Sequence, residues 1–184
     1  VENREIVEAV ETHADRFLGF LGIDLDNIER GLAEVREYAS VANIRGISIE
    51  PGSAREPRWS DDPSLDPVYE IAADYDLPVS ISLSGLLSVL GGHDMNWSRP
   101  VSIQRAAQRH PDVTFIVSHA AWPYAEEMVV VAMACPNIYV SPDLYAATRE
   151  MICAETYVKG ANLFLEDRTL VGSAYPVRDI QDAL

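Results

Sequence analysis

Apolar and polar positions divide the chain into short apolar runs separated by longer stretches with helical periodicity. Most of the runs are continuous rather than alternating, which is typical of a parallel sheet covered on both faces. The predicted strands cover residues 17–23, 44–49, 79–83, 113–118, 138–141 and 170–172. Between them, apolar residues recur at the spacing of amphipathic helices. The pattern predicts helices over residues 3–13, 28–39, 67–75, 100–109, 124–134 and 146–159.

The predicted strands follow one another at about 25–35 residues, the spacing of repeated βα units. A barrel and a doubly wound open sheet both satisfy this α/β pattern. A glycine-rich phosphate loop would favour the open sheet, but the sequence has neither a GxGxxG nor a P-loop motif. Barrel enzymes build their sites from the carboxyl ends of the strands, so we expect a barrel. Polar residues follow the predicted strands at Glu50, Ser82, Ser84, His119, Asp143 and Tyr175.

Two segments, the polar residues 53–66 and residues 84–99, are longer than ordinary connections and are predicted to be loops. Long connections in a compact domain are often functional. The second segment contains His93 directly after two glycines. We expect both segments to lie at the mouth of a pocket.

Composition narrows the class of protein. The 184 residues include 14 Lys and Arg against 29 Asp and Glu, a net charge of −15, and 48% are hydrophobic. The acidity disfavours nucleic acid and anionic membranes as partners. The two cysteines give neither a disulfide framework nor a metal-knuckle spacing. Without a membrane span or signal-peptide pattern, we expect a cytoplasmic protein with one domain over residues 1–184.

Several segments resemble the amidohydrolase-related family, among them Asn43–Ile47, Phe115–His119, Pro136–Val140 and Leu170–Pro176. This family comprises (β/α)8 metal-dependent hydrolases and decarboxylases, including aminocarboxymuconate-semialdehyde decarboxylase and resorcylate decarboxylases. The resemblance implies a TIM barrel in which the six strands correspond to the third to the eighth. About six of the eight βα units would be present, without the first strands and the closing C-terminal helices.

The resemblance also implies a divalent metal site, zinc or manganese, that is depleted in this chain. The family's His-x-His pair belongs to the first strand, and no such pair occurs here. The fifth-strand histidine position is Ser82, and the eighth-strand aspartate position is Ala174. His119 matches the sixth-strand histidine and is the retained candidate for the metal.

The strand-end residues form the candidate site. His119 is the candidate catalytic residue, as a general base, a metal ligand or a substrate donor, with a hydrogen-bonded strand-end histidine as the alternative. Asp143 is interpreted as a helix N-cap rather than a ligand. Several candidates have structural alternatives: a turn cap for Glu50, a solvated loop position for His93, and packing for Trp122 and Tyr175. The predicted substrate-binding residues are Glu50, Ser82, His93, Trp122 and Tyr175.

Two functions follow. The first is a hydrolase or decarboxylase acting on a small carboxylated or cyclic substrate. The second is a non-catalytic barrel retained for binding a ligand or a subunit, a reading favoured by Ser82 and Ala174 at two ligand positions. Six strands of a barrel leave exposed edges that invite pairing with another chain. We therefore expect a homo-oligomer.

Overall fold

A parallel sheet of five strands, neighbours in chain order, forms the centre of the protein. The structure is a computed structural model, and it describes residues 2–147 and 151–177. This topology confirms the predicted α/β class, and the unbroken strand order is that of a barrel rather than of a doubly wound sheet. The strands are β1 (Gly19–Gly22), β2 (Ile44–Ile49), β3 (Val79–Ser84), β4 (Phe115–Trp122) and β5 (Ile138–Ser141).

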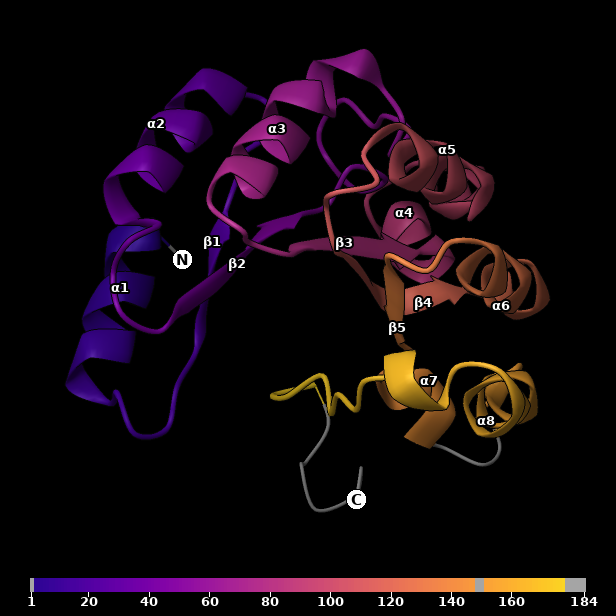
Figure 1. Cartoon of the computed structure of the whole chain (residues 1–184). Coiled ribbons are helices and arrows are strands. Elements are labelled where there is room, and N and C mark those ends of the chain that lie inside the picture. Colours follow the sequence, from indigo (N-terminus) through magenta and orange to yellow (C-terminus); the bar gives the residue numbers. More distant parts are fainter. Residues whose placement is uncertain (1, 148–150, 178–184) are drawn as a thin grey trace.

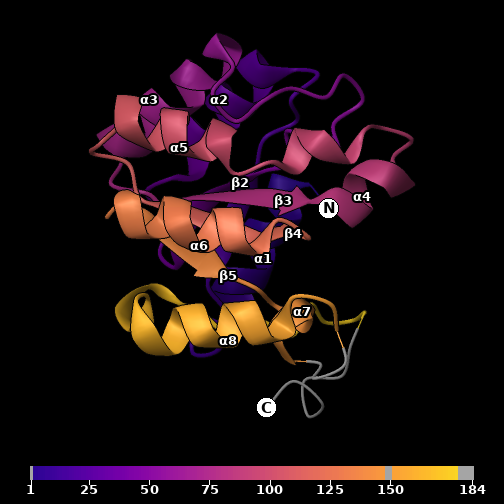
Figure 2. The ribbon, with the colours of Figure 1, turned by 90° about the vertical axis from the view of Figure 1, so that its right-hand side faces the viewer.

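Helices form an outer layer around the strands. Figure 1 shows this layer as an arc, and Figure 2 shows α5, α6 and α8 packed one beside another along one side. None of the helices in the described part of the chain is long and apolar enough to cross a membrane. The main helices are α1 (Asn3–Thr12), α2 (Ile28–Tyr38), α3 (Asp66–Asp74), α5 (Val101–Arg109), α6 (Ala125–Ala134) and α8 (Ala154–Leu163).

The two faces of the sheet differ in chemistry. Alternate residues of each strand, such as Ile47, Ile81 and Val117, are fully buried in the hydrophobic core. The residues between them lie on the opposite face, because successive side chains of a strand alternate. That face is rich in serine, and the pairing of the strands aligns these serines in two rows. Ser48 pairs with Ser80 in one row, and Ser82, Ser118 and Ser141 are paired in the next.

The serine-rich face corrects one expectation. The sequence pattern predicted strands covered by apolar contacts on both faces, yet Ser48, Ser80 and Ser118 are only partly buried. The hydroxyls of Ser80 and Ser118 lie 2.9 Å apart and hydrogen-bond each other. This face would be the interior of a closed barrel, and its small polar side chains leave room above them.

The predicted strand over residues 170–172 is wrong. Thr169 makes a single parallel bridge to Val140, and the Leu170 N–H donates to the Val140 carbonyl at 2.8 Å. Beyond this bridge the side chain of Val171 is 81% exposed. Without a further strand pairing along its outer edge in the described residues, the segment does not continue as a strand. The first predicted strand is likewise shorter, because Phe17 and Leu18 are exposed and precede β1.

Helical structure also differs from the prediction in three places, the shortest being the 3₁₀ helix η1 (Pro63–Leu65) within the predicted loop over residues 53–66. Residues 84–99, predicted to be a loop, contain α4 (Gly85–Leu90) and the 3₁₀ helix η2 (Met95–Ser98). Ser84 caps α4 by accepting a hydrogen bond from the Leu87 N–H, and the prediction of a loop overlooked this cap. The predicted helix over residues 146–159 is instead α7 (Leu144–Ala147) and α8. Cys153, at φ 74°, precedes α8 in a left-handed conformation that an unbroken helix would not contain.

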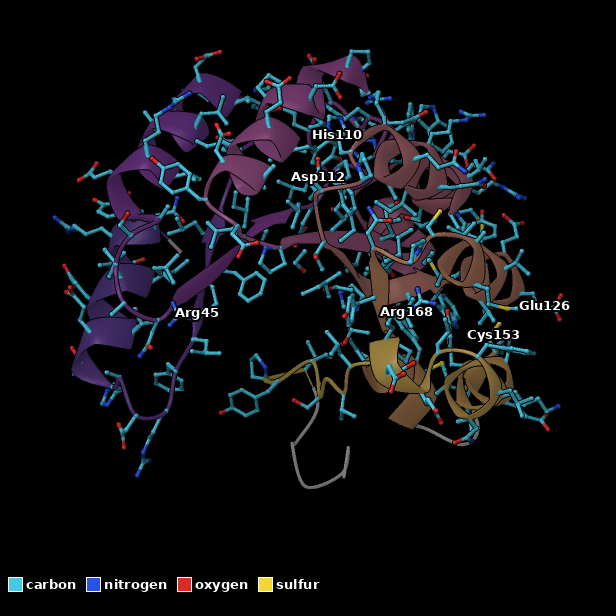
Figure 3. The ribbon with its side chains drawn as sticks, in the orientation of Figure 1. Arg45, His110, Asp112, Glu126, Cys153 and Arg168 are labelled. Carbon is cyan, nitrogen blue, oxygen red and sulfur yellow. The ribbon has the colours of Figure 1, made fainter. Side chains whose placement is uncertain are left out.

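Polar side chains tie the elements together at the amino ends of the strands. Asp66 Oδ1, at the start of α3, accepts hydrogen bonds from Arg109 Nη2 at 2.6 Å and from His110 Nε2 at 3.0 Å. Arg168 donates to three carbonyls at the end of α6 and the start of β5. His110 and Arg168 are labelled in Figure 3. His110 is thus a partly buried structural residue, and both residues stabilise the end opposite the strand termini that carry the candidate site.

Asp66 gives the first prediction. Burial opposes its charged form, but the hydrogen bonds from Arg109 and His110 outweigh this and lower the pKa of Asp66. Its contribution to stability is therefore complete above the unfolded-state pKa of about 4 and is lost as the pH falls through the folded-state pKa. Asp66→Asn should lower the free energy of unfolding by about 1–2 kcal/mol at pH 7. Urea titrations should show this difference shrinking below about pH 4.

Asp74→Asn, an exposed position on the same helix, is the control and should change the unfolding free energy by less than about 0.5 kcal/mol. Equal effects of the two substitutions at pH 7 would contradict the role given to Asp66.

Candidate active site

The end of β4 carries an unusual backbone. After Ser118 the chain passes through His119, Ala120 and Ala121 with φ values of 62°, 42° and 56°. Left-handed backbone costs a residue with a Cβ roughly 1–2 kcal/mol, so three in succession persist only where surrounding contacts hold them. This strained turn, His119–Ala121, forms a bulge in β4, between the pairing of Ser118 with Ser82 and that of Trp122 with Ser84. The His119 side chain is 22% exposed.

Asp143, directly after β5, binds the first residue of the strained turn. The main-chain N–H of His119 donates to Asp143 Oδ2 at 2.8 Å, and the Ser141 hydroxyl donates to Oδ1 at 2.6 Å. The ring Nδ1 of His119 lies 3.1 Å from the same Oδ2. The geometry between Nδ1 and Oδ2 does not meet the requirements of a hydrogen bond, and Nδ1 has no other hydrogen-bond partner among the described residues. The carboxylate therefore fixes the main chain of His119 and faces its ring.

The Asp143 carboxylate remains charged at neutral pH. Burial raises its pKa, since the side chain is only 11% exposed, but the neighbouring His119 ring and the hydrogen bonds from the Ser141 hydroxyl and the His119 N–H outweigh this effect. The net result is a lowered pKa for Asp143. A carboxylate oxygen next to Nδ1 favours a proton on Nδ1, because two acceptor atoms at that distance repel each other. Nε2 is then the basic nitrogen of the imidazole.

Ser82, on the strand next to β4, has a hydroxyl group without a hydrogen-bond partner among the described residues. It lies on β3, paired with Ser118 of β4, and is 8% exposed. Its Oγ is buried and has no hydrogen-bond partner in residues 2–147 and 151–177. Buried polar groups are nearly always satisfied. The free Ser82 hydroxyl, on the residue paired with Ser118 just before the strained turn, is therefore a candidate for contact with a bound molecule.

Two aromatic side chains wall the site next to His119. The rings of Trp122 and Tyr145 stack with centroids 4.9 Å apart and an interplanar angle of 6°. The Tyr145 ring meets His119 edge-on at 6.0 Å, and its hydroxyl lies 3.1 Å from Ser84 Oγ. Trp122 Nε1 donates to the Ile152 carbonyl at 2.9 Å. The structure thus brings Trp122, Ser82 and His119 to one end of the sheet.

The other predicted site residues lie elsewhere. Glu50 is exposed after β2, accepts the Ser53 hydroxyl at 3.2 Å, and lines a cavity of about 500 Å³ with Asp24 and Arg30. His93 is half-buried in the turn between α4 and η2. Tyr175 is 70% exposed. No contact in the described structure joins these three residues to His119, and their roles stay predictions.

A divalent metal does not fit the donor set of the described residues. No three His, Cys, Asp or Glu side chains there are placed to hold one ion. His119 and Asp143 offer one imidazole and one carboxylate, and both carboxylate oxygens already accept hydrogen bonds. Zinc and manganese require more ligands converging on one point.

Sequence reasoning missed the partnership of Asp143 with His119. Asp143 was placed among the strand-end residues, but the helix predicted after it favoured interpreting Asp143 as an N-cap. The signal was the position of both residues at the ends of neighbouring strands, where parallel order brings them together. Tyr145 gave no such signal, because an aromatic residue in an apolar helix reads as core.

The sequence matches the family model described as "Amidohydrolase" over residues 1–181. No curated protein sequence matches the chain. An uncharacterised TIM-barrel protein from Bordetella bronchiseptica is 28% identical, with a TM-score of 0.86. The alignment covers 100% of this chain and 63% of that protein. The chain therefore spans less than two thirds of this relative.

Two more distant structures share the fold. A 5-carboxyvanillate decarboxylase from Novosphingobium aromaticivorans, complexed with manganese, has a TM-score of 0.74 at 16% identity, over 98% of this chain and 60% of that one. A probable 2-pyrone-4,6-dicarboxylic acid hydrolase from Acinetobacter baumannii has a TM-score of 0.62 at 11% identity, over 98% and 68%. Both agree with the predicted TIM-barrel architecture.

Gly172 provides a test of the site's packing. A Cβ on this residue would collide with Asp143 Oδ1 and come within 3.2 Å of Ser141 Oγ. Gly172→Ala should displace the carboxylate from His119 and lower the free energy of unfolding by about 1–3 kcal/mol, measured by urea denaturation. Gly22→Ala is the control, because its Cβ would meet only Asn3 Oδ1 at 3.9 Å. A Gly172→Ala protein as stable as the control would contradict this packing.

Proposed function

The chain belongs to the amidohydrolase family, and we propose that it carries the proton-transfer site of a hydrolase or decarboxylase acting on a small carboxylated or cyclic substrate. The observation that carries the proposal is the charged Asp143 carboxylate held against His119, next to the unpartnered Ser82 hydroxyl. The names of the relatives support the substrate class, since they describe a carboxylated aromatic ring and a cyclic dicarboxylate.

His119 transfers the proton in either reaction. In hydrolysis, Nε2 accepts a proton from the attacking water as its oxygen bonds to the substrate carbonyl carbon. In decarboxylation, the bond to the carboxyl group breaks and carbon dioxide leaves. The electron pair that stays on the ring carbon takes the Nε2 proton of His119 in its imidazolium form, and the neutral imidazole then regains a proton from water. Asp143 remains ionised in both cases and stabilises the imidazolium form, as an adjacent carboxylate does for other catalytic histidines.

Ser82 and the aromatic wall position the substrate. The Ser82 hydroxyl donates to a carboxylate or carbonyl oxygen, which satisfies its buried Oγ. The stacked rings of Trp122 and Tyr145 form an apolar side against which a flat substrate ring packs. Glu50, His93 and Tyr175 are proposed to contact more distant parts of the substrate.

The relative complexed with manganese supports a divalent metal ion as the cofactor of a complete site, but the donors among the described residues do not form one. This same observation favours the second candidate function, a non-catalytic barrel that binds a ligand or a subunit.

Turnover of defined substrates separates the two functions. The purified protein is incubated with 5-carboxyvanillate and with 2-pyrone-4,6-dicarboxylate, and substrate loss is followed by absorbance and chromatography. We expect turnover of at least one, and His119→Gln should reduce kcat by about 100- to 10,000-fold, the range for removing a general acid or base.

His13→Gln, at an exposed histidine after α1, is the matched control and should leave kcat unchanged. Turnover that survives in His119→Gln would contradict the role of His119. Saturable binding of either compound without any turnover would support the non-catalytic barrel.

A further inference from the structure

Tyr157 reaches the strained turn from the outer layer of helices. It lies on α8 with 4% of its surface exposed, and its hydroxyl donates to the carbonyl of Ala120 at 3.0 Å. Close packing of α8 on α6 sets this position, since a Cβ on Gly160 would come within 2.8 Å of the Val129 side chain. A residue outside the sheet thereby contacts the backbone that carries His119.

Ala120 is the middle residue of the strained turn, and it is fully buried. Its carbonyl would lose this bond if the Tyr157 hydroxyl were removed, and an unsatisfied buried carbonyl is costly. Burial raises the pKa of Tyr157, so its hydroxyl stays protonated and remains a donor. The hydrogen bond therefore opposes relaxation of the turn towards an ordinary backbone conformation.

Several partners of this turn and of the residues that flank it lie between β5 and α8 or on α8 itself. The Asp143 carboxylate accepts a hydrogen bond from the His119 N–H, and the Ile152 carbonyl accepts one from the Trp122 indole N–H. Cys153 lies at the start of α8, with its Sγ 3.4 Å from the Pro123 carbonyl. Figure 3 shows Cys153 on the same side of the molecule as Glu126, in the first turn of α6. Asp143, Ile152, Cys153 and Tyr157 thus contact the end of β4 or the residues that follow it.

We propose that Tyr157 is a positioning residue that holds His119 in its reactive orientation by fixing the Ala120 carbonyl. Tyr157 itself does not touch the substrate. The inference deepens the proposed function, on which it rests for the use made of His119. One part of the inference is purely structural: the Tyr157 hydroxyl keeps the strained turn in its left-handed conformation. This part does not depend on whether the protein has the proposed activity.

The test compares Tyr157→Phe with Tyr69→Phe in the full chain. Tyr69 is an equally buried tyrosine whose hydroxyl also donates to a backbone carbonyl, that of Ser60, at 2.6 Å. It lies on α3 and makes no contact with the strained turn. The two variants lose the same chemical group, so a general loss of stability should affect them alike.

Amide hydrogen exchange measured by NMR is the first readout. In Tyr157→Phe we expect exchange of the His119 amide to accelerate by at least about tenfold, with little change in Tyr69→Phe. With a substrate that turns over, Tyr157→Phe should lower kcat by about tenfold or more at an unchanged KM, because a misplaced reacting group affects the rate rather than binding.

Exchange at His119 that stays as slow as in the unmodified protein would overturn the inference. So would equal acceleration in both variants, which would show a global effect. Accelerated exchange only in Tyr157→Phe, without turnover by the unmodified protein, would support the positioning role while refuting the proposed function.

Discussion

The hydrogen bond from the His119 N–H to the Asp143 carboxylate is the interaction on which the site depends. It joins the carboxyl ends of β4 and β5, and it is the first restraint on a turn whose three residues all adopt left-handed backbone. The same carboxylate oxygen faces the imidazole ring. One charged side chain therefore fixes both the main chain and the chemical state of His119.

Such a strained element needs stability from the rest of the fold. The helix-facing side of the sheet provides it, because Leu21, Ile47, Ile81 and Val117 are fully buried in one core. The opposite side of the sheet carries serines in place of apolar residues, so it lacks this packing. This division explains how the same strands serve two purposes, stability towards the helices and free polar groups towards the interior.

The sequence was informative where local chemistry decides the structure. The bounds of β2 and β5 agree with the predicted runs, because each run is apolar and ends at a proline-containing breaker, Pro51 or Pro142. The resemblance to the amidohydrolase family also predicted the order of the strands in the barrel. These predictions depend on patterns that a single chain displays directly.

Other features depend on contacts that the sequence does not display. Asp143 has the local pattern of an N-cap, and only the pairing of β4 with β5 turns its carboxylate towards His119. Tyr157 reads as a core residue because its partner, the Ala120 carbonyl, is distant in sequence. The strand expected at residues 170–172 failed for a related reason, since strand formation requires neighbours that periodicity does not specify.

The tautomer of the His119 imidazole tests the central claim most directly. Long-range ¹H–¹⁵N NMR spectra at neutral pH distinguish a proton on Nδ1 from a proton on Nε2 without requiring a substrate. Because the ionised Asp143 carboxylate lies 3.1 Å from Nδ1, we predict that neutral His119 carries its proton on Nδ1. The Nε2–H tautomer as the main neutral form would contradict it, because Nε2 would then not be the base that receives the proton.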